Sequence, residues 1–112
     1  MSYYVLRYFF DAGSGICLWA GNEEAEEKFG YPVELHEIDL SDNVQRTGQR
    51  LVAWFDTSID WNDPAGPSPW SEQERGRFQE ESRSFLSMLR QCLGPDFEVR
   101  DESLLGTAGR SA

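Results

Sequence analysis

The chain has 112 residues, of which 39% are hydrophobic and 13% aromatic, enough for one hydrophobic core and too apolar for a disordered chain. Twenty acidic against ten basic residues give a formal net charge of −10, so the surface repels nucleic-acid phosphates and anionic lipid and attracts basic proteins. Plain solubility is the alternative explanation of that charge.

The cysteine count and the hydropathy bear on the compartment. Cys17 and Cys92 are too few for a disulfide scaffold, and we expect both to be reduced thiols in the core. No apolar run approaches the roughly 18 residues of a membrane span. The N-terminal residues carry neither the basic segment nor the cleavage site of a signal peptide. We therefore expect a cytoplasmic protein with no membrane or nucleic-acid partner.

The N-terminal third predicts a hairpin. Residues 3–10 and 16–20 are rich in aromatic and β-branched side chains, and the turn between them contains two glycines. Leu6, Tyr8 and Phe10 share one face of the first strand. The other face is apolar apart from Arg7, which predicts a strand that is central or covered on both faces.

A short helix over residues 23–29 follows, with Asn22 as N-cap and Gly30 just beyond its end. Residues 33–40 leave two possibilities open, because their alternation of apolar and polar side chains slips at His36. They form either a bulged strand or an extended connection to the next helix.

The next helix covers about residues 42–58. Ser41 is a good N-cap, and apolar residues then recur at helical spacing. Gly48 lies on this apolar stripe, which predicts close packing against a neighbouring element.

The last helix runs from about residue 72 to 93. Ser71 and Glu74 have the spacing of a capping box, and Gly94 and Pro95 stop the helix. Its buried stripe is predicted to contain Phe78, Phe85, Leu86, Leu89, Cys92 and Leu93.

Residues 96–100 alternate strictly and predict a short edge strand, whereas residues 104–112 are small and mostly polar and predict a flexible tail. The order of elements indicates a single α+β domain over residues 1–103. We expect a small antiparallel sheet, made of the N-terminal hairpin and the C-terminal strand, packed against two longer helices and one short helix.

The connection between the long helices is the first candidate recognition surface. It holds three of the five prolines, and we expect its tryptophans, Trp61 and Trp70, to be exposed, with Trp19 and Trp54 in the core. Aspartates recur there at Asp56, Asp60 and Asp63.

These aspartates have three possible uses: a divalent-cation site, a partner contact, or ordinary solvated acids. Their spacing does not match an EF-hand. The single histidine, His36, rules out a pair of histidines for zinc, and nothing around it supports a thiol nucleophile. We therefore expect no enzyme, no cofactor and no metal.

Negative charge is concentrated in the first half of the chain. Between residues 23 and 42, eight acids stand against one lysine, whereas the helix over 72–93 mixes both signs. An acidic face beside tryptophans is what a binder of a basic protein uses, because charge speeds the encounter and aromatic side chains supply affinity.

The segment Ala53-Trp-Phe-Asp-Thr-Ser-Ile-Asp-Trp, with Pro67-Ser-Pro-Trp-Ser71, resembles that of small acidic bacterial immunity proteins of polymorphic or contact-dependent toxin systems. The resemblance covers about residues 4–100. It implies a cognate inhibitor that covers the active site of a toxin, many of which are basic nucleases, and it assigns no functional residues.

Three hypotheses remain: such an immunity protein, a small metal-dependent enzyme using the aspartates, and a structural or regulatory interaction module. The oligomeric state stays open. Under the first hypothesis, the residues expected to bind a basic toxin are Glu23, Glu24, Glu26, Glu27, Asp39, Asp42, Asp56, Asp60, Trp61, Asp63 and Trp70.

Overall fold

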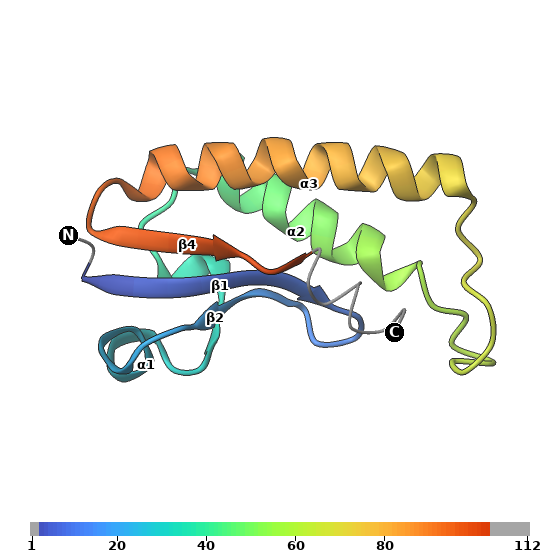
Figure 1. Ribbon diagram of the computed structural model, residues 1–112, viewed down its shortest axis with the longest axis horizontal. Coiled ribbons are helices and arrows are strands. Elements are labelled where there is room, and N and C mark those ends of the chain that lie inside the picture. The colour runs from blue at the N-terminus through green and yellow to red at the C-terminus, as the bar shows by residue number, and fades with distance from the viewer. Residues whose placement is uncertain (1–2, 104–112) are drawn as a thin grey trace.

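A four-stranded sheet carries two long helices on one face (Figure 1). The computed structural model describes residues 3–103, so the predicted tail over 104–112 lies outside the described residues. The helices are α1 (Glu23–Phe29), α2 (Asp42–Asp56) and α3 (Glu72–Leu93), with a 3-10 turn η1 (Leu35–Glu37). The strands are β1 (Tyr4–Asp11), β2 (Ile16–Ala20), β3 (Pro32–Val33) and β4 (Phe97–Asp101), in the spatial order β3-β2-β1-β4.

The α+β class and the N-terminal hairpin are confirmed, but the predicted pairing of the last strand is wrong. β4 runs parallel to β1, so the sheet is mixed rather than antiparallel. The cause is α3, whose 22 residues span about 33 Å and carry the chain back along the sheet to the end where β1 begins. β4 therefore enters beside the start of β1 (Figure 1).

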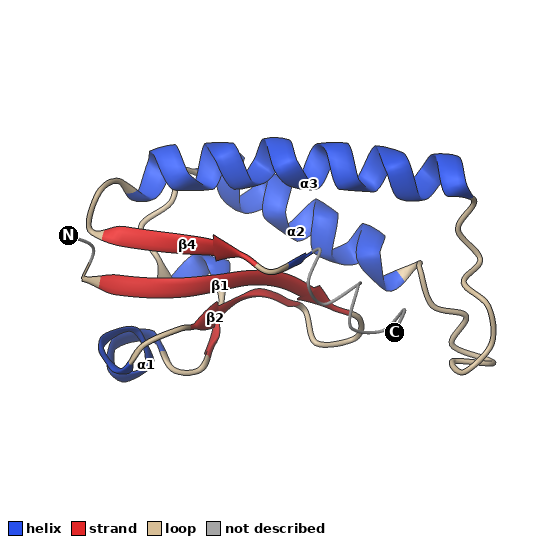
Figure 2. Ribbon diagram, in the orientation of Figure 1, coloured by secondary structure: helices blue, strands red, loops and turns tan. Residues whose placement is uncertain are grey.

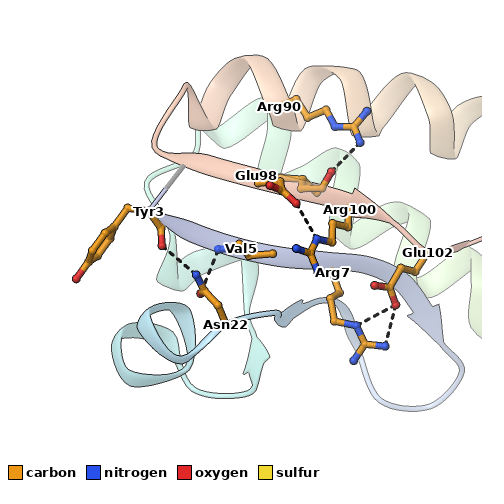
Figure 3. A network of polar contacts seen from close by, with 9 residues as sticks. Tyr3, Val5, Arg7, Asn22, Arg90, Glu98, Arg100 and Glu102 are labelled. Atoms are coloured by element: carbon orange, nitrogen blue, oxygen red, sulfur yellow. Dashed lines mark hydrogen bonds and ion pairs between the residues drawn. The ribbon is translucent and has the colours of Figure 1, made fainter. Parts of the chain in front are cut away.

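β1 is central, as predicted, and its two faces differ. Leu6, Tyr8 and Phe10 are buried under the helices. The Tyr8 hydroxyl lies 2.8 Å from Ser82 Oγ and donates to the Ser82 carbonyl at 3.1 Å, and burial raises the pKa of Tyr8 far above its ordinary value. On the opposite face Arg7 pairs with Glu102 at 2.8 Å, and their hydrogen bond raises the pKa of Arg7 (Figure 3).

Gly48 permits the close packing that its position on the stripe predicts. It is buried in α2, and a Cβ atom there would lie 2.8 Å from Phe85 Cζ and would also clash with Leu35. Because α2 touches both α3 and η1 at this point, the glycine fixes how near the three elements approach.

The ends of α3 agree with the prediction, with one variation in the capping box. Ser71 Oγ accepts a hydrogen bond from Glu74 N at 3.1 Å, and Gly94 ends the helix with a positive φ of 79°. The Glu74 carboxylate accepts a hydrogen bond from the indole of Trp54 at 3.0 Å and so links α3 to α2.

The two cysteines have different environments. Cys17 is buried, as predicted, and burial raises the pKa of its thiol to about 12. The prediction of a buried Cys92 is wrong, because this thiol is exposed on the last turn of α3. Leu89, one turn earlier, is fully buried, whereas Leu93 at the end of the helix is only half-buried.

The ambiguous stretch 33–40 is mostly an extended connection. Val33 pairs with Leu18 in the two-residue strand β3, and η1 follows immediately. Leu35, Ile38 and Leu40 are buried although they follow neither strand nor helix spacing, because the chain turns at η1 and then runs along the core.

Candidate partner-binding surface

The acidic part of the chain, residues 22–42, presents its carboxylates outward; we call it the acidic segment. Glu23, Glu26 and Glu27 of α1 are exposed and Glu24 is half-buried. Asp39 and Asp42, before and at the start of α2, are exposed as well. The structure therefore leaves these side chains accessible to a partner.

α1 is fixed to the sheet by Asn22, which caps the helix and forms hydrogen bonds with the backbone at the start of β1 (Figure 3). Its side-chain oxygen accepts from Ala25 N at 3.0 Å and from Val5 N at 3.2 Å, and its amide donates to the Tyr3 carbonyl at 3.0 Å. The glutamates thus stand on an anchored helix, so presenting them to a partner costs little conformational entropy.

The charge of the acidic segment is largely uncompensated. Among the ion pairs of the described residues, only Glu34–His36, at 3.3 Å, lies within it. Arg50 of α2 instead pairs with Glu81 of α3 at 2.6 Å. The acidic segment therefore projects a negative potential, whereas α3 presents mixed charges.

The loop between α2 and α3, residues 57–71, is fastened to the hairpin turn. The Trp61 side chain is 56% exposed, yet its indole donates to the Asp56 carbonyl at 3.0 Å. A Cβ atom at Gly13 would lie 3.1 Å from the Trp61 ring, and Asp56 Oδ1 accepts a hydrogen bond from Gly13 N at 2.8 Å. Asp56 and Trp61 therefore have structural roles in addition to any contact with a partner.

Trp70 is half-buried, so the expectation of an exposed indole needs correction. Its ring packs against Phe78, with centroids 5.1 Å apart, and against Trp54 at 5.9 Å. Its indole donates to Thr57 Oγ1 at 2.7 Å. Trp70 precedes the N-cap residue of α3, and a hydrophobic residue at this position often packs against the fourth residue of the helix, here Arg75. In this protein the ring packs against Phe78 instead.

The aspartates of the loop act separately. Asp60 Oδ1 accepts from Asn62 N at 3.0 Å, and the Asp63 carbonyl accepts from Gly66 N at 2.9 Å. Within residues 3–103, no group of three acids, histidines or cysteines is arranged to hold a metal ion. The metal hypothesis therefore lacks a ligand set in the described part of the chain.

The predicted binding residues form two groups rather than one surface. α1 and the beginning of α2 lie toward the left of Figure 1, and the loop over 57–71 projects beyond the sheet at the right, as Figure 2 also shows. The long axis of the molecule measures 41 Å. The two groups are therefore separated along most of its length.

The sequence did not single out two exposed tyrosines that flank α1. Tyr3 is 59% exposed and Tyr31 is 45% exposed. Tyr31 accepts a hydrogen bond from Arg7 at 3.2 Å, and its ring lies 5.5 Å from that of Trp19. For Tyr31, which follows α1 by two residues, that position was the available signal, because tyrosine is favoured in protein interfaces. Tyr3 comes near α1 only through the fold, where its carbonyl accepts a hydrogen bond from Asn22.

Comparison with known proteins identifies the family. No curated protein matches the chain. A family model described as Serratia CdiI immunity protein-like matches residues 6–101, from within β1 to the last residue of β4. None of the described helices is long and apolar enough to cross a bilayer. The match covers all the elements that build the fold, and the chain therefore belongs to the Serratia CdiI immunity protein-like family, whose role is toxin neutralisation.

Proposed function

We propose that this immunity protein is a non-catalytic cytoplasmic inhibitor that binds a basic toxin domain through its acidic segment and covers the toxin's active site. The observation that carries the proposal is the anchored, exposed and largely unpaired set of carboxylates on α1 and before α2. Tyr3, whose carbonyl accepts from the N-cap residue of α1, and Tyr31, two residues after α1, are exposed and supply aromatic contact area.

Electrostatics supports a basic target. Opposite potentials raise the rate of encounter, and this effect decreases over a Debye length of about 8 Å at physiological salt. A nuclease that binds phosphates has a cationic cleft. A carboxylate-rich inhibitor competes for such a cleft with the nucleic acid itself, which favours a nuclease as the target.

An ordinary interface is too small to cover both groups of predicted binding residues, and the largely unpaired carboxylates favour the acidic segment as the main contact. A standard interface covers about 800 Å² of each partner, a patch roughly 30 Å across. Such a patch is shorter than the 41 Å long axis of the molecule. We therefore assign Asp60, Trp61 and Asp63 a secondary contact at the far end, and Trp70 a mainly structural role.

The test is the affinity for the toxin domain encoded beside this gene, measured by biolayer interferometry. Glu26→Lys with Glu27→Lys reverses two exposed charges in the middle of α1 and leaves the N-cap residue Asn22 unchanged. We expect binding to weaken at least about tenfold, mainly through slower association, and neutralisation in cells to fail at low expression.

The matched control is Glu72→Lys with Glu80→Lys, which changes the net charge equally at two exposed positions of α3 that form no ion pair among the described residues. It should change the affinity less than about threefold at physiological salt. Equal losses in both double variants would mean that only net charge matters, and an unchanged affinity in the α1 variant would refute the assigned surface.

A further inference from the structure

We propose that a shallow groove between η1 and α2 receives an arginine side chain of the toxin and thereby sets the register of the complex. This inference rests on the proposed function. It adds a specific anchoring site and the chemistry of its occupant to the general attraction of the acidic segment.

The groove has a volume of about 200 Å³ and two different walls. α2 contributes Gln49, Val52, Ala53 and Asp56, which lie on one face of the helix because their spacing is i, i+3, i+4 and i+7. The opposite wall carries Glu34 and His36 from around η1.

Gly15, in the turn between β1 and β2, also lines the groove. A Cβ atom at Gly15 would have no neighbour within 4 Å. The turn therefore does not crowd the groove at this residue.

The two carboxylates that line the groove favour a cation as its occupant. Glu34 and Asp56 line the groove from the two walls, and a carboxylate has about four acceptor positions. The contact of Glu34 Oε2 with His36 Nδ1, at 3.3 Å, uses one of those of Glu34. The bond from Gly13 N uses one of those of Asp56. Asp56 is also the last residue of α2, where the helix dipole disfavours negative charge, so a bound cation relieves an unfavourable interaction.

The shape of the groove favours arginine over lysine. A guanidinium is flat and weakly hydrated, so its faces can lie on the side chains of Val52 and Ala53 while its edge donates to carboxylates on either side. An ammonium is a compact and strongly hydrated point charge, and a shallow apolar floor offers it little in exchange for its water.

The groove continues the acidic segment, since Glu34 belongs to both. Attraction by the α1 glutamates brings a basic partner to this side of the molecule. The groove then holds one particular side chain between a helix and a fixed turn. Capture and anchoring are thus separable, and different variants test them.

The first test fills the groove. Ala53 is exposed on α2, so Ala53→Trp places an indole over the floor without disturbing the core. We expect the affinity for the adjacent-encoded toxin domain to decrease at least about thirtyfold, mainly through faster dissociation. The matched control is Ser84→Trp, at an exposed position of α3, which should change the affinity less than about threefold. Circular dichroism and the urea midpoint establish that both variants fold.

The second test identifies the occupant. Glu34→Gln keeps the shape of the side chain and removes its charge. It is combined in double-mutant cycles with lysine substitutions of the toxin's surface arginines and alanine substitutions of its surface lysines. We expect substitution of one toxin arginine to weaken binding to the wild-type chain about fivefold more than it weakens binding to the Glu34→Gln variant.

The outcomes separate the two proposals. Wild-type affinity in Ala53→Trp, together with weakened binding in the α1 double variant, would overturn the groove and leave the proposed function intact. Coupling of Glu34 to a toxin lysine alone would overturn the assignment of arginine. A toxin domain that does not bind the wild-type chain would refute the proposed function itself.

Discussion

The sequence predicts binding residues in both the acidic segment and the loop over 57–71, yet the two regions have different roles in the structure. In the loop, Trp61 and Trp70 are tied to backbone or side-chain partners, and Trp70 packs against the core. In the acidic segment the carboxylates of α1 project outward from a clamped helix. Residue type alone therefore does not identify a recognition surface, because the same indoles and carboxylates also hold a loop in place.

The largest effect expected on stability concerns Trp70. Trp70→Ala removes ring contacts with Phe78, Trp54 and Phe55 and leaves Thr57 without its indole donor. We expect the free energy of unfolding to decrease by about 3 kcal/mol, measured by urea denaturation. A loss below about 1 kcal/mol would mean that Trp70 contributes little to stability and is available for binding a partner.

The contact between Trp61 and the hairpin turn can be isolated with two glycines. Gly13 and Gly15 both have positive φ, at 85° and 74°, but only a Cβ at Gly13 meets the Trp61 ring. Gly13→Ala should cost about 2 kcal/mol and Gly15→Ala about 1 kcal/mol in urea unfolding. Equal costs would mean that the ring moves aside freely and that Trp61 is available to a partner.

Asp56 allows its hydrogen bond to be separated from its charge. Asp56→Ala removes the acceptor for Gly13 N and should cost about 1 kcal/mol in the free energy of unfolding. Asp56→Asn keeps an acceptor oxygen and should cost less. If the two variants are equally stable, the bond to the turn contributes nothing measurable.

The smallest effect on stability is expected in the acidic segment. Glu26→Lys with Glu27→Lys changes exposed side chains that form no ion pair among the described residues, so the urea midpoint should correspond to a change within about 0.5 kcal/mol. The same variant should lose affinity for the toxin. A large loss of stability would mean that these glutamates, like the loop, serve the fold.

Salt provides a further way to sharpen the comparison. Raising the salt concentration should slow association of the toxin with the wild-type chain, since screening weakens attraction by exposed charges. The α1 double variant should show a weaker salt dependence than the Ala53→Trp variant, which retains the α1 charges. Identical salt dependence in the two variants, measured by stopped-flow kinetics, would contradict the separation of capture from anchoring.

Much of the secondary structure could be predicted from short stretches of sequence. Asn22, Ser41 and Ser71 each cap the helix that their own sequence context indicates, and the glycines after α1 and α3 end those helices as expected. These features depend on hydrogen bonds between residues within one or two turns, so a sequence window contains all the partners. The excess of acids in the first half of the chain is likewise visible without a structure.

Several features depended on contacts between distant parts of the chain. They are the direction of β4, the partial burial of Trp70, the exposure of Cys92 and the groove beside η1. Gly13 and Asp56 are 43 positions apart, and nothing near either residue indicates that they meet. The sequence by itself determined where the helices begin, where α1 and α3 end, and where the negative charge lies. Only the tertiary structure decided which aromatic and acidic side chains are already engaged, because packing assigns partners that local spacing does not contain.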